Sequence, residues 1–147
     1  MNTLELVKKL RPHLGRRLGD VCPADRLPGH VTDKPKFYVV NTDESRRAGD
    51  HWVLFYFPKK KPAEFFDAMG NPPHHYHRRF VNVLMANSGD YSYNRKRLQN
   101  GGTCGQFCIY YALNRRRGLD ASDILDTFDR RNLAYNDSIV LNFVNTL

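Results

Sequence analysis

The chain has 147 residues, of which 41% are hydrophobic and 12% aromatic. This length and composition predict one globular domain over residues 1–147 with a sizeable core, and they exclude a disordered protein. No apolar run approaches the roughly 20 residues that a membrane-spanning helix needs, and no signal-peptide pattern opens the chain. We therefore expect a soluble, intracellular protein with no membrane partner.

The net charge of +8 is distributed unevenly along the sequence. Residues 120–147 carry two arginines against five aspartates, a balance of −3, so residues 1–119 carry +11. A basic region of this kind attracts nucleic acid or an acidic partner. Ordinary solubilising charge explains it equally well, so DNA stays an open partner at this stage.

The first half of the chain contains a helix pattern followed by strand patterns. Apolar residues recur on one face over residues 3–11 and predict a helix that Thr3 would cap. Residues 15–35 are rich in Gly, Pro and Asp and predict an irregular segment. Three strands with short connections then favour an antiparallel meander, and the second strand, WVLFYF, is apolar enough for burial on both faces. These strands are predicted at 36–41, 52–57 and 64–68, with a polar turn at 42–50.

The second half of the chain is mainly helical. The predicted elements are a helix over 75–87, a strand over 91–99, a helix from Thr103, and two further helices capped by Ser122 and Asp137. Strands and helices follow one another in a mixed order, and no βαβ unit repeats. This order predicts an α+β fold in which helices pack on a mixed, mainly antiparallel sheet.

The sequence around the three cysteines indicates that they lie in different environments. Their odd number and the lack of a secretion pattern indicate free thiols at Cys22, Cys104 and Cys108. The stretch LQNGGTCGQFC (98–108) places Cys104 after two glycines, at the start of a predicted helix. A helix N-terminus lowers the pKa of a thiol, and the N–H groups of Cys104 and Gly105 could bind an oxyanion there. Cys108 lies one turn further along among apolar residues, and we expect it in the core.

A cysteine nucleophile needs a base, and the base needs an orienting group. His51 is the candidate base among six histidines because it stands at the start of the apolar strand, held rigidly yet near the surface. Asp67 ends the following strand, and a hairpin would bring it to the same end of the ladder as His51. Gln99 lies five residues before Cys104, and its amide could donate to an oxyanion.

Together these motifs resemble the adenain-like cysteine proteases, the family of the adenovirus maturation protease, whose clan also contains the SUMO-specific proteases. The resemblance rests on the segment VVNTDESRRAGDHW ending at 51–52, the acid at the next strand end, and the pattern Gln-x4-Cys-Gly at 99–105. CGQFCIYYAL is similar to the central helix of that clan. The resemblance implies an α+β cysteine endopeptidase with its nucleophile at the N-terminus of a central helix. The implied roles are nucleophile for Cys104, base for His51, orienting group for Asp67 and oxyanion donor for Gln99, with Trp52 and Gly105 supporting the cleft.

The resemblance also implies substrates and partners. The substrates would be precursor proteins of viruses or virus-like elements, cleaved beside small residues, especially Gly. The protein would be a monomer in the virion or in the host nucleus or cytoplasm. The chemistry needs no cofactor, but the family's activators, a short viral peptide and DNA, are expectations here. Cys22 could form a disulfide with such a peptide or be a buried thiol.

Three other interpretations stay open. A deubiquitinating or deSUMOylating isopeptidase, acting on conjugates that end in Gly-Gly, would use the same residues. A non-catalytic nucleic-acid-binding module would use the basic clusters with Tyr91 and Tyr93. A metal site could involve His74, His75 and His77, although their spacing matches no known zinc motif.

Overall fold

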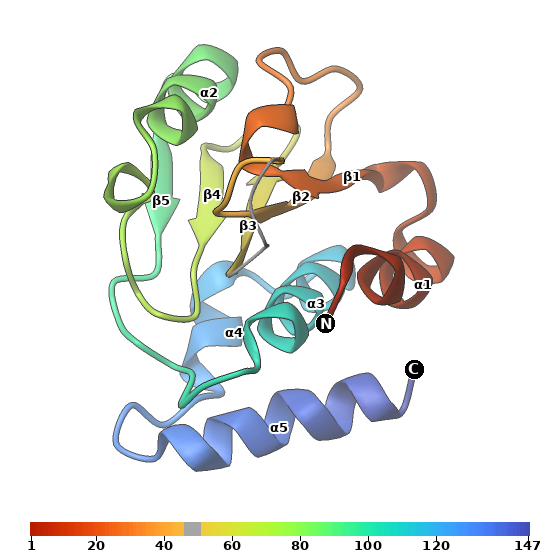
Figure 1. The fold of residues 1–147 in the computed structure, drawn as a ribbon, viewed down its shortest axis with the longest axis vertical. Coiled ribbons are helices and arrows are strands. Elements are labelled where there is room, and N and C mark those ends of the chain that lie inside the picture. The colour runs from red at the N-terminus through yellow and green to blue at the C-terminus, as the bar shows by residue number, and fades with distance from the viewer. Residues whose placement is uncertain (46–50) are drawn as a thin grey trace.

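The computed structural model describes residues 1–45 and 51–147. One five-stranded sheet, in the order β1–β2–β3–β4–β5, runs through the molecule with helices on both faces (Figure 1). The strands are β1 (Leu18–Pro23), β2 (Lys36–Asn41), β3 (Trp52–Phe57), β4 (Ala63–Phe66) and β5 (Tyr91–Tyr93). The helices are α1 (Thr3–Leu14), α2 (Arg78–Ser88), α3 (Cys104–Arg116), α4 (Ala121–Asp126) and α5 (Leu133–Asn145), with 3₁₀ turns at Gly15–Arg17, Ala24–Arg26 and Pro73–His75. In the described ranges, no helix is long and apolar enough to cross a bilayer. The α+β class predicted from the sequence is confirmed.

β2, β3 and β4 form the predicted antiparallel meander, and parallel pairings add β1 and β5 at the two edges. β1 corrects the prediction of an irregular segment over 15–35. This strand contains Gly19, Asp20 and Pro23, which weaken a strand pattern, and its pairing with β2 forms it nonetheless. The strand predicted over 91–99 ends at Tyr93. The predicted turn at 42–50 lies partly outside the described residues.

β3 separates two hydrophobic cores, as its continuous apolar sequence predicts. Phe55 packs on one side with Phe65 and with Phe80 of α2. Leu54 points to the other side, where it belongs to the core formed with α1, α3 and α5. Because side chains alternate along a strand, this arrangement fixes which residues at the end of β3 face α3.

α3 lies in the centre of the second core and carries the candidate nucleophile as its first residue. Cys108 is 1% exposed, so its predicted place in the core is confirmed. Near the other end of the helix, Arg115 donates from Nη2 and Nε to the Glu64 carboxylate over 2.8 and 3.0 Å, and the Tyr111 hydroxyl donates to it over 2.6 Å. Since this buried ion pair is fully hydrogen-bonded, it fastens α3 to β4. The position of α3, and with it that of Cys104, is therefore fixed relative to the sheet.

Three helix caps differ from the predictions. In each case the helix begins before its apolar pattern, because the first turn is exposed and hydrophobic spacing does not mark it. The observed caps of α1, α4 and α5 are Asn2, Asp120 and Asn132, in place of Thr3, Ser122 and Asp137.

Candidate active site

Three side chains that are far apart in the sequence meet at one end of the sheet. His51 immediately precedes β3, Asp67 immediately follows β4, and Cys104 begins α3. Leu54 pairs with Phe66, so the hairpin carries His51 and Asp67 to the same end of the β3–β4 ladder. α3 packs on the β3 face that Leu54 occupies, which adds Cys104. The structure thus brings the predicted nucleophile, base and orienting group together.

His51 lies between the carboxylate and the thiol. Its Nε2 is 2.6 Å from Asp67 Oδ1, and the ring also hydrogen-bonds Cys104. Because Nε2 faces Asp67, Nδ1 is the nitrogen left for the thiol. The Asp67 side chain is fully buried, whereas 14% of the His51 side chain is exposed. This order of groups is that of a nucleophile, a base and a group that orients the base.

The pKa values of His51 and Cys104 shift in opposite directions. Burial works to lower the pKa of His51, but hydrogen bonds to Asp67 and Cys104 outweigh it and raise this pKa to about 9. Burial likewise works to raise the pKa of Cys104, yet the hydrogen bonds from His51 and from the Trp52 backbone bring it below its ordinary value. A thiolate beside an imidazolium is therefore favoured, and the thiolate is the nucleophilic form.

Asp67 stays ionised because several donors surround it. The Tyr76 hydroxyl donates to Oδ2 over 2.5 Å, and the N–H groups of Met69 and Asn71 donate to Oδ1 and Oδ2 over 2.9 and 3.3 Å. Burial works to raise the pKa of this carboxyl, but the bonds from His51 and Tyr76 lower it overall. The buried carboxylate can therefore keep a negative charge beside the imidazole.

Asn94 fixes the backbone of Asp67. Its Oδ1 accepts from the Asp67 N–H over 3.0 Å, and its Nδ2 donates to the Asp67 carbonyl over 2.5 Å. Neither Asn94 nor Tyr76 is predicted from the sequence to be part of the site. The one usable signal was the helix-breaking pair of prolines before Tyr76, which places that residue in a turn and not on the predicted helix face.

Gln99 lines the same surface hollow as His51. Its backbone N–H donates to the Ala68 carbonyl over 3.2 Å, and its side chain is almost fully buried. Its Oε1 has no hydrogen-bond partner in the described part of the chain, which costs free energy unless a ligand supplies a donor. Since the two ends of an amide can exchange by rotation, Gln99 can offer a substrate either an acceptor or N–H donors.

The loop before Cys104 is shaped by a glycine and fixed by α5. Gly102 has a φ of +72°, a conformation that favours glycine. Asp137 accepts from the Asn100 N–H over 3.1 Å and from the Thr103 hydroxyl over 2.8 Å. The Thr103 hydroxyl is directed toward Asp137, and Thr103 makes no side-chain cap on α3. The first N–H groups of α3 are therefore not taken by a side-chain cap, and that of Gly105 hydrogen-bonds the Cys104 sulfur, where it stabilises the thiolate.

Trp52 and Gly105 border the nucleophile. The backbone N–H groups of both residues hydrogen-bond the Cys104 sulfur. The Trp52 indole N–H donates to the Met1 carbonyl over 2.8 Å, so this group already has a partner. A Cβ on Gly105 would lie 3.2 Å from Met1 Cβ and 3.5 Å from a Leu6 methyl group, so a larger residue here would have to displace Met1 by a few tenths of an ångström. Trp52 thus supports the site through its backbone.

The histidines of the possible metal site and the cysteine of the possible disulfide lie in surroundings that do not favour either role. Within residues 1–45 and 51–147, no three His, Cys, Asp or Glu side chains gather as metal ligands would. His77 Nε2 lies 2.5 Å from the Thr42 carbonyl oxygen. Cys22 is a free thiol, and burial raises its pKa to about 12. A thiol with this pKa is a poor nucleophile for disulfide exchange.

No protein-family model and no curated protein match the sequence. Among solved structures, the fold is similar to the crystal structure of the selenomethionine form of the ASFV pS273R protease, with a TM-score of 0.43 and 22% sequence identity. The match covers 70% of this chain and 43% of that chain, so this chain spans less than half of the length of the ASFV protein.

Proposed function

We propose that the chain is a cysteine endopeptidase that uses Cys104, His51 and Asp67 as a catalytic triad. The observation that carries this proposal is the continuous hydrogen-bonded chain from the thiol through the imidazole to the buried carboxylate. A merely structural cysteine would have a raised pKa, as Cys108 has, whereas the pKa of Cys104 is lowered despite its burial.

The reaction follows from this geometry. The Cys104 thiolate attacks the scissile carbonyl carbon, and the oxyanion accepts hydrogen bonds from the start of α3 and from the Gln99 amide. The His51 imidazolium then gives its proton to the leaving amine, and a thioester remains on Cys104. Neutral His51 next takes a proton from a water molecule. This water attacks the thioester, the acid is released, and Cys104 leaves as a thiolate beside the newly protonated His51, which restores the starting pair. Asp67 keeps the ring oriented throughout.

The motif resemblance supports a more specific proposal. The substrates are precursor proteins of a virus or virus-like element, cleaved beside small residues such as glycine. The enzyme acts as a monomer in the virion or in the host nucleus or cytoplasm, with a short viral peptide and DNA as candidate activators. An isopeptidase for ubiquitin-like conjugates would use the same triad, and it differs in preferring a branched Gly-Gly-Lys linkage.

A Gly-X-Gly-X peptide library tests the proposal, with and without DNA and with products identified by mass spectrometry. The wild type should cleave beside glycine, and Cys104→Ala and His51→Ala should not. Cys108→Ala is the matched cysteine control and should retain activity. Cleavage by a pure, folded Cys104→Ala sample would refute the nucleophile assignment.

A Gly-Gly vinyl sulfone probe separates the remaining alternatives. Labelling at Cys104 alone excludes a non-catalytic nucleic-acid-binding module. If the protein strongly preferred branched over linear Gly-Gly substrates, its function would be that of an isopeptidase and not that of an endopeptidase.

A further inference from the structure

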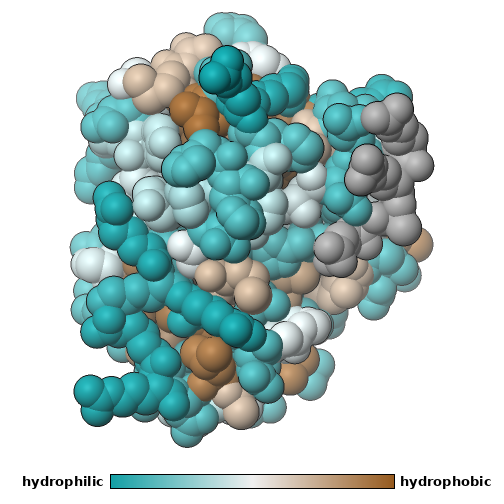
Figure 2. Space-filling model, turned by 60° about the vertical axis from the view of Figure 1, so that its left-hand side comes forward, coloured by the Kyte–Doolittle hydropathy of each residue, from teal (hydrophilic) through white to brown (hydrophobic). Residues whose placement is uncertain are grey.

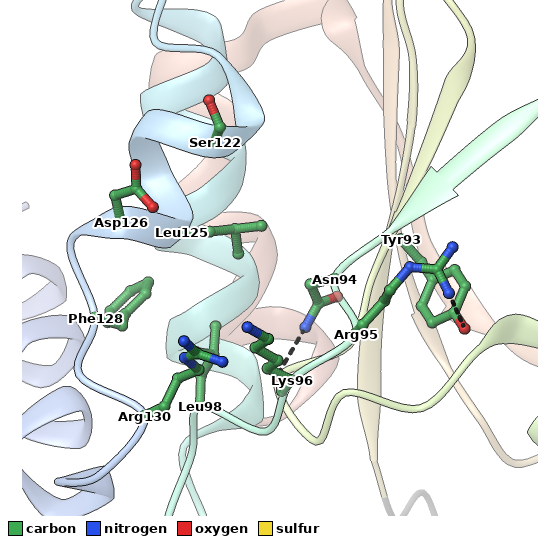
Figure 3. A pocket seen from close by; sticks show the side chains of 10 residues that line it. All are labelled: Tyr93, Asn94, Arg95, Lys96, Leu98, Ser122, Leu125, Asp126, Phe128 and Arg130. Atoms are coloured by element: carbon green, nitrogen blue, oxygen red, sulfur yellow. Dashed lines mark hydrogen bonds between the residues drawn. The ribbon is translucent and has the colours of Figure 1, made fainter.

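A second hollow, of about 470 Å³, lies between the segment after β5 and the region of α4 (Figure 3). It shares no lining residue with the hollow that contains His51 and Gln99. Lys96 and Leu98 belong to one wall, and Leu125, Phe128 and Arg130 belong to the other. Figure 2, which brings this side of the molecule forward, shows long hydrophilic side chains spread over smaller hydrophobic areas.

The hollow combines an apolar floor with a basic rim. Leu98 and Phe128 are 3% and 8% exposed at the floor, and Leu125 is half-buried above them. Lys96 and Arg130 are exposed, and Figure 3 shows their side chains directed into the space between the walls. In the described ranges, neither side chain has an ion-pair or hydrogen-bond partner. These two cations are therefore available to an anionic group from outside the chain.

The two walls are joined by buried hydrogen bonds. Asn136 of α5 is fully buried, and its Nδ2 donates to the Leu98 carbonyl over 3.0 Å and to the Asp129 carbonyl over 2.7 Å. Its Oδ1 accepts from the Asp129 N–H over 2.8 Å. Phe128 packs against Phe107 of α3, with ring centroids 5.2 Å apart. The hollow is thus already formed, and a ligand need not order it on binding.

We propose that this hollow docks an acidic segment of the protein substrate that carries one large apolar side chain. The apolar side chain covers the floor, and neighbouring carboxylates pair with Lys96 and Arg130. Arg95, Lys96 and Arg130 against Asp126 leave the lining at +2, which favours an anionic occupant. Nucleic acid fits less well, because Asp126 in the same lining repels phosphates and Phe128, only 8% exposed, offers little ring surface for a base to stack on.

The segment from Asn94 to Gln99 connects this hollow to the residues around the proposed triad. Asn94 also lines the hollow, and its side chain holds the Asp67 backbone. Leu98 is followed directly by Gln99, and both donate from their N–H groups to the Ala68 carbonyl. A segment docked here therefore lies next to the proposed cleft, so it can anchor a substrate by a second contact. Only the identity of the partner as a substrate rests on the proposed function.

The binding test uses the Cys104→Ala protein, so that no cleavage occurs, and a fluorescein-labelled Asp-Glu-Phe-Asp-Glu peptide followed by polarisation. Lys96→Glu/Arg130→Glu should weaken binding by about tenfold or more, as the loss of close charge pairs does. The matched control is Lys59→Glu/Lys60→Glu on the exposed connector after β3. The affinity of this variant for the peptide should stay within about twofold of that of the parent, because distant surface charges are screened by salt. Peptides with Asn-Gln for Asp-Glu, or Ala for Phe, should bind more weakly.

An equal loss in both double variants would overturn the proposal, because binding would then follow net charge alone. The proposal would also be overturned if the peptide with Asn-Gln for Asp-Glu bound as tightly as the acidic peptide. A dT oligonucleotide that binds through Lys96 and Arg130, while the acidic peptide does not bind, would assign the hollow to nucleic acid.

The cleavage test attaches the acidic segment to a glycine-containing peptide substrate. KM should fall for the wild type and not for Lys96→Glu/Arg130→Glu, while kcat stays similar. An unchanged KM would overturn the role in substrate docking. Peptide binding without cleavage of any substrate would refute the proposed function and leave the binding result intact, so the two failures can be told apart.

Discussion

Replacing Tyr76 by phenylalanine removes a hydroxyl that donates to Asp67 and also accepts from Asn71 Nδ2 over 3.3 Å. The Tyr76 hydroxyl donates to Asp67 Oδ2 over 2.5 Å, and without it this oxygen keeps only the 3.3 Å contact from the Asn71 N–H. A hydrogen bond to a charged group contributes roughly 1.5–3 kcal/mol, so Tyr76→Phe should lower the free energy of unfolding by about 2 kcal/mol at neutral pH. If about half of this loss falls on the orientation of the His51 ring by Asp67, kcat/KM should drop about fivefold.

The pH profile distinguishes this role from simple structural support. Loss of the Tyr76 donor raises the pKa of Asp67, and this more basic carboxylate accepts more strongly from the imidazolium, so the alkaline limb of kcat/KM, near pH 9 in the wild type, should move to higher pH. Tyr93→Phe is the matched control, because Tyr93 is half-buried and, among the residues that the structure describes, its hydroxyl has exposed Arg95 as its hydrogen-bond partner. Denaturant unfolding and the pH profile should be measured for both variants. Identical profiles for Tyr76→Phe and Tyr93→Phe would refute the reasoning.

Three further predictions test other parts of the site. Gln99→Ala should lower kcat by about 10²–10³-fold with little change in KM, as the loss of an oxyanion donor does, and steady-state kinetics would show it. Iodoacetamide alkylation of Cys104, followed by mass spectrometry, should titrate below the ordinary thiol pKa in the wild type and above it in His51→Ala, where burial acts without the imidazolium. Cys108→Ala should lower the free energy of unfolding by about 1 kcal/mol in denaturant melts and leave kcat unchanged; a large loss of kcat would contradict its place in the core.

The residues of the proposed triad could be chosen from the sequence through the resemblance to the adenain-like proteases, and they could be placed because each lies at the end of a regular element. His51 precedes an apolar strand, Asp67 ends the next one, and Cys104 begins a helix. The register of a hairpin and the start of a helix are local properties. Their relative placement then needs only that the helix packs on the strand that follows His51, and the apolar faces of both elements favour this packing.

The residues that hold the triad could not be found in the same way. Tyr76 and Asn94 act on Asp67 from other segments of the chain, and Asn136 joins two loops from a distant helix. Asn and Tyr are common polar residues in loops and helices, so their local sequence says little about the partner that they reach. Their roles are decided by how the segments pack, which no local pattern contains.

Asp137 shows how such a choice of partner links a distant helix to the site. Local sequence favours it as a helix cap, yet Asn132 caps α5, and Asp137 binds the loop before the nucleophile. The Thr103 hydroxyl is directed toward this carboxylate, and Thr103 makes no side-chain hydrogen bond to the first N–H groups of α3. Those N–H groups are the ones that an oxyanion beside Cys104 requires. Asp137 binds Asn100 and Thr103 in the loop that leads to them, so a residue of the C-terminal helix connects the fold to the proposed catalytic step.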